Sequence, residues 1–217
     1  MQSLLCYNEN MTKTFDNLAS KETISKTEKA LTEHGFLPET VATGVEALAR
    51  IKELIPAGVS VMNGSSRTLE EMGFVQYLKE GEHGWNNLHK AIVEEKDPVK
   101  QSLLRQQSVL SEYFLSSVHA LSETGELVIA SNSGSQLPSF AFTSPNIILV
   151  VGTQKITSTV NEAIRRLNEY VLPLEDARMK SVGMGGSFIS KLLVVNREPS
   201  FMGRKVHILL VNEKLGF

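Results

Sequence analysis

Small polar residues and one lysine gather in four short segments, each of which adjoins an apolar run. The segments are Asn63-Gly64-Ser65-Ser66-Arg67-Thr68, Glu123-Thr124-Gly125, Ser133-Gly134-Ser135-Gln136 and Gly152 to Lys155. Backbone amides, hydroxyls and an ammonium are groups that hold a phosphate or a carboxylate. In an open α/β sheet, ligands bind at the carboxyl ends of the strands. We therefore expect one site for a small anion, formed jointly by the four segments.

The segment from Asn63 to Thr68 is expected to connect a strand to a helix. Thr68 and Glu71 have the spacing of a capping box, so a helix should begin near Thr68. Free N–H groups at a helix N-terminus favour an anion. Simple capping of the helix by Ser66 or Thr68 is the alternative use of the same hydroxyls. The Gly-Lys-Ser/Thr of a P-loop is missing from this segment.

Glu123 and Lys155 are the candidates for catalysis. Glu123 lies in a turn between two expected strands, and a carboxylate in a partly dry pocket can act as a nucleophile or as an acid–base group. Lys155 follows the apolar run Ile147–Val151, so it should project near the strand ends, where it could neutralise an anion or act as a base. The alternatives are a solvated turn residue and a solvated lysine.

The sequence predicts no metal site and no cofactor. Cys6 is the single cysteine, so it cannot form an internal disulfide, and alone it cannot build a zinc or iron–sulfur site. The Gly-rich segment Gly183–Ser187 lacks the preceding strand of a dinucleotide-binding loop. The histidines are scattered without metal-ligand spacing, and His119 is expected to be a packed or surface residue on a strand.

Composition excludes several classes of protein. A chain of 217 residues with 41% hydrophobic and 21% charged residues is typical of a globular domain. A net charge of −2 gives no indication of binding to nucleic acid or to an anionic membrane. No apolar stretch is long enough to span a bilayer, and a secretory signal is not evident. Together with the lone cysteine, this predicts a cytoplasmic protein.

Apolar periodicity predicts the elements that position the four segments. Residues 12–35 and 43–55 have the spacing of amphipathic helices, and the fully apolar run Ile147–Val151 is typical of a central strand. We expect four strands in a common sheet, namely Val59–Met62, Leu127–Ala130, Ile147–Val151 and Val206–Val211. Residues 81–116 break the alternation and are expected to form a helical excursion on the sheet edge or over the site.

The order and spacing of these motifs resemble the LUD-domain family, which includes the lactate utilization protein LutC. The resemblance covers roughly Leu31 to Phe217 and rests on residues 63–68, 123–128, 133–135, 150–156 and 213–217. It implies an α/β fold of the NagB/RpiA/CoA-transferase-like type, an open sheet flanked by helices. We expect an N-terminal helical arm over residues 1–35 and the LUD-like domain over residues 36–217.

The resemblance also implies a biological setting. It associates the chain with the oxidation of L-lactate to pyruvate, alongside iron–sulfur partner proteins. In the CoA-transferase branch of the fold, a glutamate at a turn comparable to that of Glu123 is the nucleophile. Close relatives tend to carry several cysteines before the final strand, whereas residues 179–204 of this chain have none. Metal or cluster binding is therefore not carried over.

Three functions remain open. The first is a LutC-like protein that binds a small anionic metabolite, accessory to lactate or other organic-acid oxidation. The second is a free-standing sugar-phosphate isomerase or CoA-transferase-like enzyme, which needs Glu123 or Lys155 in a closed pocket. The third is a structural partner of an iron–sulfur protein, which needs an exposed apolar patch such as one on the helices of residues 85–116. A homodimer is left open.

Overall fold

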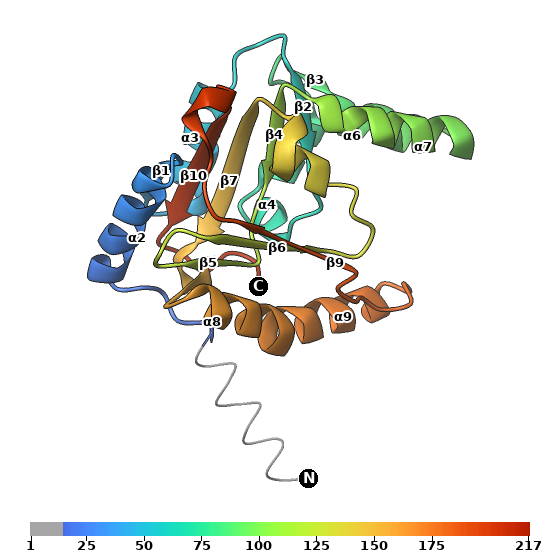
Figure 1. Ribbon diagram of the computed structural model, residues 1–217. Helices are drawn as coiled ribbons and strands as arrows, with labels where there is room; N and C mark the ends of the chain where they lie inside the picture. Colours follow the sequence, from blue (N-terminus) through green and yellow to red (C-terminus); the bar gives the residue numbers. More distant parts are fainter. Residues whose placement is uncertain (1–14) are drawn as a thin grey trace.

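The computed structural model describes residues 15–217, and its central element is a six-stranded parallel sheet (Figure 1). The strand order is β1 (Leu37–Val41), β10 (Lys205–Val211), β7 (Asn146–Gly152), β4 (Tyr113–Ser116), β2 (Ser60–Asn63) and β3 (Asn86–Asn87). Every neighbouring pair in this sheet is parallel. The run from Ile147 to Gly152 is buried throughout, as both-face coverage of a parallel strand requires. Ile147–Val151 is confirmed as a central strand.

A second sheet of four strands lies beside the first. Its order is β8 (Ile156–Thr157), β5 (Ala120–Ser122), β6 (Leu127–Ser131) and β9 (Lys191–Val195). The expectation that Leu127–Ala130 shares a sheet with Ile147–Val151 is therefore wrong. Gly125, with φ of 98°, allows a tight turn that pairs β6 antiparallel with β5. For β6 to pair parallel with the strand before it, the connection would need a crossover of about a dozen residues, and this turn is much shorter.

The two faces of the main sheet bury different hydrophobic clusters. Because successive side chains of a strand point to opposite faces, Ile147 and Leu149 join one cluster while Ile148 and Val150 join the other. The first cluster also contains Leu121 of the second sheet and Leu31 of helix α2 (Lys21–Glu33), from the expected N-terminal arm. The second cluster is completed by helices α3 (Gly44–Leu54), α4 (Arg67–Glu71) and α5 (Phe74–Glu80).

Side-chain caps set where the helices begin. The Ser20 hydroxyl accepts from the Thr23 N–H, so α2 begins at Lys21 rather than at residue 12, and residues 12–14 lie outside the described part of the chain. Thr159 caps α8 (Val160–Arg166) in the same way. That helix continues through the turn η4 (Leu167–Val171) into α9 (Leu172–Ser181), and its Ala163 and Leu167 pack on the second sheet.

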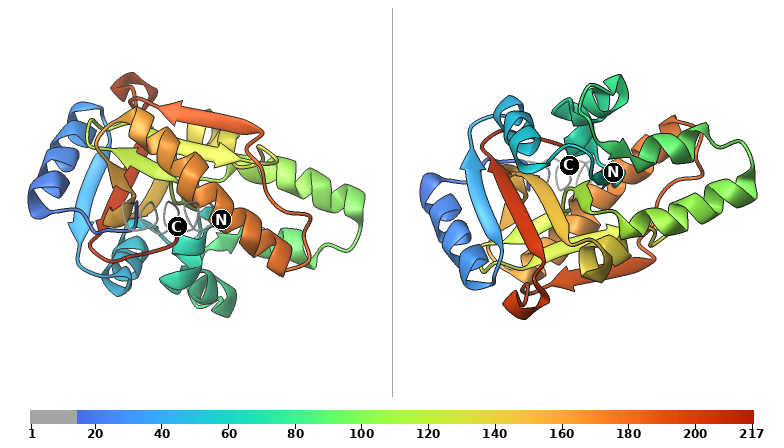
Figure 2. Two further views of the ribbon diagram at one scale, coloured as in Figure 1. Left: turned by 90° about the horizontal axis from the view of Figure 1, so that it is seen from below. Right: turned by 90° about the horizontal axis from the view of Figure 1, so that it is seen from above.

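The helical excursion is real but shorter than expected. Helices α6 (Leu88–Glu94) and α7 (Pro98–Gln107) extend away from the main sheet (Figures 1 and 2), and α7 buries none of its residues. Residues 113–116, expected to belong to the excursion, instead form β4, between β7 and β2. The Glu112 carboxylate, which accepts from the Ser60 N–H at 2.7 Å, fixes the start of β4 beside β2. No helix among residues 15–217 is long and apolar enough to cross a bilayer.

Candidate functional site

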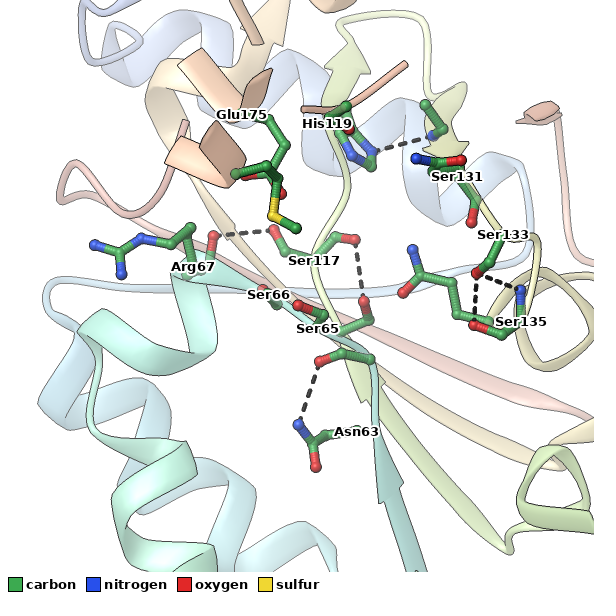
Figure 3. Close-up of a pocket in the computed structure, with 18 of the residues that line it drawn as sticks. Asn63, Ser65, Ser66, Arg67, Ser117, His119, Ser131, Ser133, Ser135 and Glu175 are labelled. Carbon is green, nitrogen blue, oxygen red and sulfur yellow. Dashed lines mark hydrogen bonds between the residues drawn. The ribbon is translucent and has the colours of Figure 1, made fainter. Parts of the chain in front are cut away.

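A cleft of about 870 Å³ opens where β2, β4 and β6 reach their carboxyl ends. The last residues of these strands, Asn63, Ser116 and Ser131, all line it. Figure 3 shows side chains from segments far apart in the sequence, including Ser65, Ser117 and Ser133, around the same space. The remaining wall includes residues of α6, α7, η4 and α9, and residues from the segments 108–109 and 182–189. The position is the one that open α/β sheets use for ligands.

Lys155 is the most deeply buried cationic side chain in this cleft. It ends the short turn η3 (Thr153–Lys155) that follows β7, and it is 3% exposed. Its Nζ donates to Thr68 Oγ1 at 2.8 Å, to Ser117 Oγ at 3.1 Å and to the Val118 carbonyl oxygen at 3.3 Å. Within the described chain it forms no ion pair with a carboxylate. Its ammonium is therefore solvated by neutral oxygens alone.

Burial lowers the pKa of Lys155 to about 7. The charged form loses its water without gaining a counterion, and the positive charge of Arg166 lowers the pKa further, while Glu71 partly opposes both effects. Near neutral pH the amine therefore exists in both protonation states. Such a group can attract an anion when charged and accept a proton when neutral.

The C-terminal segment packs against the partners of Lys155. Thr68 Oγ1 donates to the Leu215 carbonyl at 3.2 Å, and Gln154 Nε2 donates to the same oxygen at 3.0 Å. Gly216 has φ of +65°, and a Cβ there would lie 2.6 Å from Thr68 Oγ1 and 3.3 Å from Lys155 Nζ. Only glycine fits this position without displacing the lysine's neighbours. Sequence reasoning missed this role, although the glycine near the C-terminus was its signal.

His119 also lines the cleft. Its Nδ1 accepts from the Ala130 N–H at 3.1 Å, so in the neutral ring Nε2 carries the proton. Burial lowers the pKa of His119 to about 3, and the charges of Lys155 and Arg166 act in the same direction. The ring is therefore a neutral hydrogen-bond donor at physiological pH. No sequence motif marks it.

Two other cations of the cleft are already neutralised. Arg67 pairs with Glu70 at 2.8 Å and with Glu71 at 3.0 Å, and Arg178 pairs with Glu175 at 2.7 Å. In the described chain, Lys155 and Arg105 are the lining cations without a carboxylate within ion-pair distance, and Arg105 lies on the outer helix α7. The electrostatic attraction for an anion at the strand ends therefore centres on Lys155.

Two residues that line the cleft, Asn63 at the end of β2 and Gln136 in the loop after β6, each have a buried side-chain amide oxygen. Gln136 Oε1 and Asn63 Oδ1 have no hydrogen-bond partner among residues 15–217. A Cβ at Gly64 would lie 2.4 Å from Gln136 Oε1, so the absence of a side chain at this position lets the glutamine approach. These oxygens can accept a hydrogen bond from a ligand hydroxyl. The cleft thus offers acceptors as well as donors.

The structure brings together three of the four predicted segments. The predicted residues that line the cleft are Asn63, Gly64, Ser65, Ser66, Arg67, Thr68, Ser133, Ser135, Gln136 and Lys155. Gly134 and Gly152 are not among the residues that line it. Ser66 caps α4 by accepting from the Leu69 N–H, the alternative use expected for its hydroxyl.

The segment Glu123-Thr124-Gly125 does not join this cleft. It forms the turn before β6, whereas the cleft lies beyond the other end of that strand, at Ser131. The Glu123 carboxylate accepts a hydrogen bond from Lys26 Nζ at 2.6 Å, and the Thr124 hydroxyl is hydrogen-bonded to the Ser122 hydroxyl. The expected joint site is corrected accordingly, because an antiparallel hairpin carries its turn away from the end of its second strand.

Among the described residues, no group of three or more histidine, cysteine, aspartate or glutamate side chains is arranged to hold a metal ion. Cys6 lies outside those residues.

Comparison with known proteins places the chain in a family. Residues 24–211 match the LUD domain. The crystal structure of a DUF162 family protein from Deinococcus radiodurans is similar with a TM-score of 0.51 and 13% identity, covering 90% of this chain and 100% of that chain. This similarity confirms the fold, an open α/β sheet flanked by helices. No curated protein matches the sequence. The match over most of its length shows that the chain belongs to the LUD-domain family.

Proposed function

We propose that this LUD-domain chain binds a small metabolite with a carboxylate or phosphate group, in a role accessory to lactate or other organic-acid oxidation. The observation that carries the proposal is Lys155, a buried ammonium held by two hydroxyls and one carbonyl with no carboxylate partner in the described chain. Burying a charge without a counterion is unfavourable by several kcal/mol. An anionic ligand would supply the missing charge.

The neutral groups of the cleft support a hydroxy acid as the ligand. His119 Nε2 and the serine hydroxyls can donate to a carboxylate, while Asn63 Oδ1 and Gln136 Oε1 can accept from a hydroxyl. A 2-hydroxy acid such as lactate carries both kinds of group on adjacent carbons. The match between these two sets of groups is the reason for favouring lactate-like ligands over simple anions.

Acid–base catalysis by Lys155 is a second candidate function. An amine with a pKa of about 7 is partly neutral at physiological pH and can take a proton from a bound ligand. Glu123 lies outside the cleft, so the proposal gives it no part in this chemistry. If the wild type sustains turnover of a hydroxy acid, sugar phosphate or acyl-CoA and Lys155→Met does not, the result would support catalysis by Lys155.

The cellular location of the protein and its partner are also proposed. We infer a cytoplasmic chain that works beside an iron–sulfur partner protein, as the family resemblance implies. Helix α7 supports a docking role, because Val99 and Leu103 are 78% and 52% exposed on a helix that buries no residue of its own. Co-purification of the full-length chain with its iron–sulfur neighbour, lost in Leu103→Asp, would test this.

Calorimetric titration tests the binding proposal. Wild type, Lys155→Met and the control Lys205→Met would be titrated with lactate, pyruvate, inorganic phosphate and acetyl-CoA at pH 6 and pH 8.5. Lys205 is exposed and does not line the cleft. A charge-assisted hydrogen bond contributes about 1.5–3 kcal/mol, so Lys155→Met should weaken binding about tenfold or more, and the control should not. Absence of binding to wild type, or equal binding to Lys155→Met, would contradict the proposal.

A further inference from the structure

The cleft extends well beyond the polar groups around Lys155. Its volume of about 870 Å³ falls in the range of roughly 300–1,000 Å³ that holds drug-sized ligands, and lactate is far smaller than such a molecule. The additional lining is largely aliphatic and aromatic. It consists of Ile92, Val93, Val109, Leu172, Met179, Val182, Met184 and Phe188.

These apolar side chains come from two walls. Ile92 and Val93 belong to α6, whereas Val182, Met184 and Phe188 belong to the segment that follows α9. Four of them remain open to solvent, with Val93 59% exposed, Val182 61%, Met184 57% and Phe188 63%. Exposed apolar side chains clustered along a cleft mark a surface that an apolar group covers.

In the described chain, the outer part carries one cation without a carboxylate partner, Arg105, whose side chain is exposed on α7. Arg178 and Glu175, which lie beside Met179 on α9, neutralise each other at 2.7 Å. Lys155, at the polar end, has no such partner within the described chain. The cleft therefore combines one buried cation with a long apolar wall, and its charge pattern complements a molecule with one anionic end.

We propose that the cleft binds an amphipathic monocarboxylate, with the carboxylate at Lys155 and an unbranched hydrocarbon chain between α6 and the segment of residues 182–188. This inference rests on the proposed function and names the substrate class. The chain would cover Val93, Val182 and Phe188, and a hydroxyl near the carboxylate would meet Asn63 and Gln136.

A chain-length series tests the apolar part of the proposal. Wild-type protein would be titrated with acetate, hexanoate and decanoate, and with decanol as a neutral molecule of the same length as decanoate. Burying one methylene group should lower Kd about fourfold, so affinity should rise steeply from acetate to hexanoate. Decanol should bind at least tenfold more weakly than decanoate. An equal Kd for all three carboxylates would overturn the inference, and Lys155-dependent binding of acetate in that case would leave the proposed function standing.

Surface variants locate the hydrocarbon chain without changing charge. The double variant Val93→Asn/Val182→Asn should weaken decanoate binding at least fivefold and leave acetate binding within twofold. The control Val99→Asn replaces a valine that is 78% exposed on α7 and does not line the cleft, so it should change neither. Equal effects of the double variant and the control would overturn the assignment of the chain to this wall. Undiminished decanoate binding by Lys155→Met would overturn both this inference and the proposed function.

Discussion

Lys155 and Glu123 follow similar sequence patterns yet lie in opposite environments. Lys155 comes after β7, a strand of the parallel sheet, and is 3% exposed with neutral hydrogen-bond partners. Glu123 forms the turn between β5 and β6, where it pairs with Lys26, a lysine whose side chain is 60% exposed. Parallel strands deliver their carboxyl ends to one edge of a sheet, whereas an antiparallel pair places its turn at the far end. Strand pairing therefore decides which polar turn becomes a site.

Lys155 and Glu123 also differ in how their charges affect the stability of the fold. An ion pair at the surface such as Lys26–Glu123, whose side chains are 60% and 21% exposed, contributes about 0–1 kcal/mol. A buried ammonium without a counterion lowers the stability of the unliganded fold, and a bound anion should offset this cost. Lys155 should therefore destabilise the protein while it favours ligand binding, whereas Glu123 should do neither.

The largest expected effect is on stability as a function of pH. Lys155 has a pKa of about 7 in the folded chain and 10.5 as its ordinary value. Between these values the unfolded chain binds more protons, so the free energy of unfolding of wild type should rise with pH, relative to Lys155→Met, by up to about 1.4 kcal/mol per pH unit. Below pH 7 the difference should be constant.

Denaturant unfolding of both proteins without ligand, at pH 6, 8 and 9.5, measures this difference. Lys155→Met should be the more stable protein at pH 6, because it removes a buried charge. A difference between the two proteins that stays the same from pH 6 to pH 9.5 would contradict the buried, uncompensated lysine.

A smaller effect is expected from Gly216→Ala. Its φ of +65° disfavours any side chain, and the new Cβ would lie 2.6 Å from Thr68 Oγ1. Gly203→Ala is a matched control, because Gly203 has φ of +67° and nothing within 4 Å of the added Cβ. Both should lose about 1 kcal/mol from backbone strain, and Gly216→Ala should lose a further ~1 kcal/mol or more from the clash.

Thermal unfolding compares the two glycine variants, and phosphate titration shows whether the clash reaches Lys155. Gly216→Ala alone should bind phosphate more weakly. Equal stability and equal phosphate affinity of the two variants would show that the C-terminal segment does not position the lysine's partners.

The smallest effect is expected at the hairpin turn. Glu123→Gln removes one surface ion pair, so it should change the free energy of unfolding by at most about 1 kcal/mol and leave ligand affinity unchanged. Calorimetric titration and denaturant unfolding measure both. A tenfold loss of affinity, or loss of a turnover shown by wild type, would return Glu123 to the site and favour the CoA-transferase-like enzyme.

The features that the sequence could predict are those that depend on local pattern. The apolar run Ile147–Val151 identified the central strand, and the polar segment after Met62 identified a turn that lines the cleft. The Ser66 hydroxyl also caps α4, one of the two uses expected for it. Each of these signals lies within a few consecutive residues.

The features that could not be predicted depend on tertiary pairing. Residues 113–116 continue a helix-like apolar spacing, and only their place between β7 and β2 makes them a strand. His119 becomes a cleft residue because Ala130, on the paired strand, donates to its ring. Gly216 meets Thr68, a residue that precedes it by about two-thirds of the chain. No local pattern contains this information.

The measurement that tests the central claim most directly is the NMR titration of the Lys155 side chain in lysine-labelled protein, with Lys155→Met used to assign its signal. We expect a pKa of about 7 without ligand. A bound anion favours the charged amine, so saturating lactate, phosphate or decanoate should raise that pKa. A pKa near 10.5 that none of these anions changes would contradict the account.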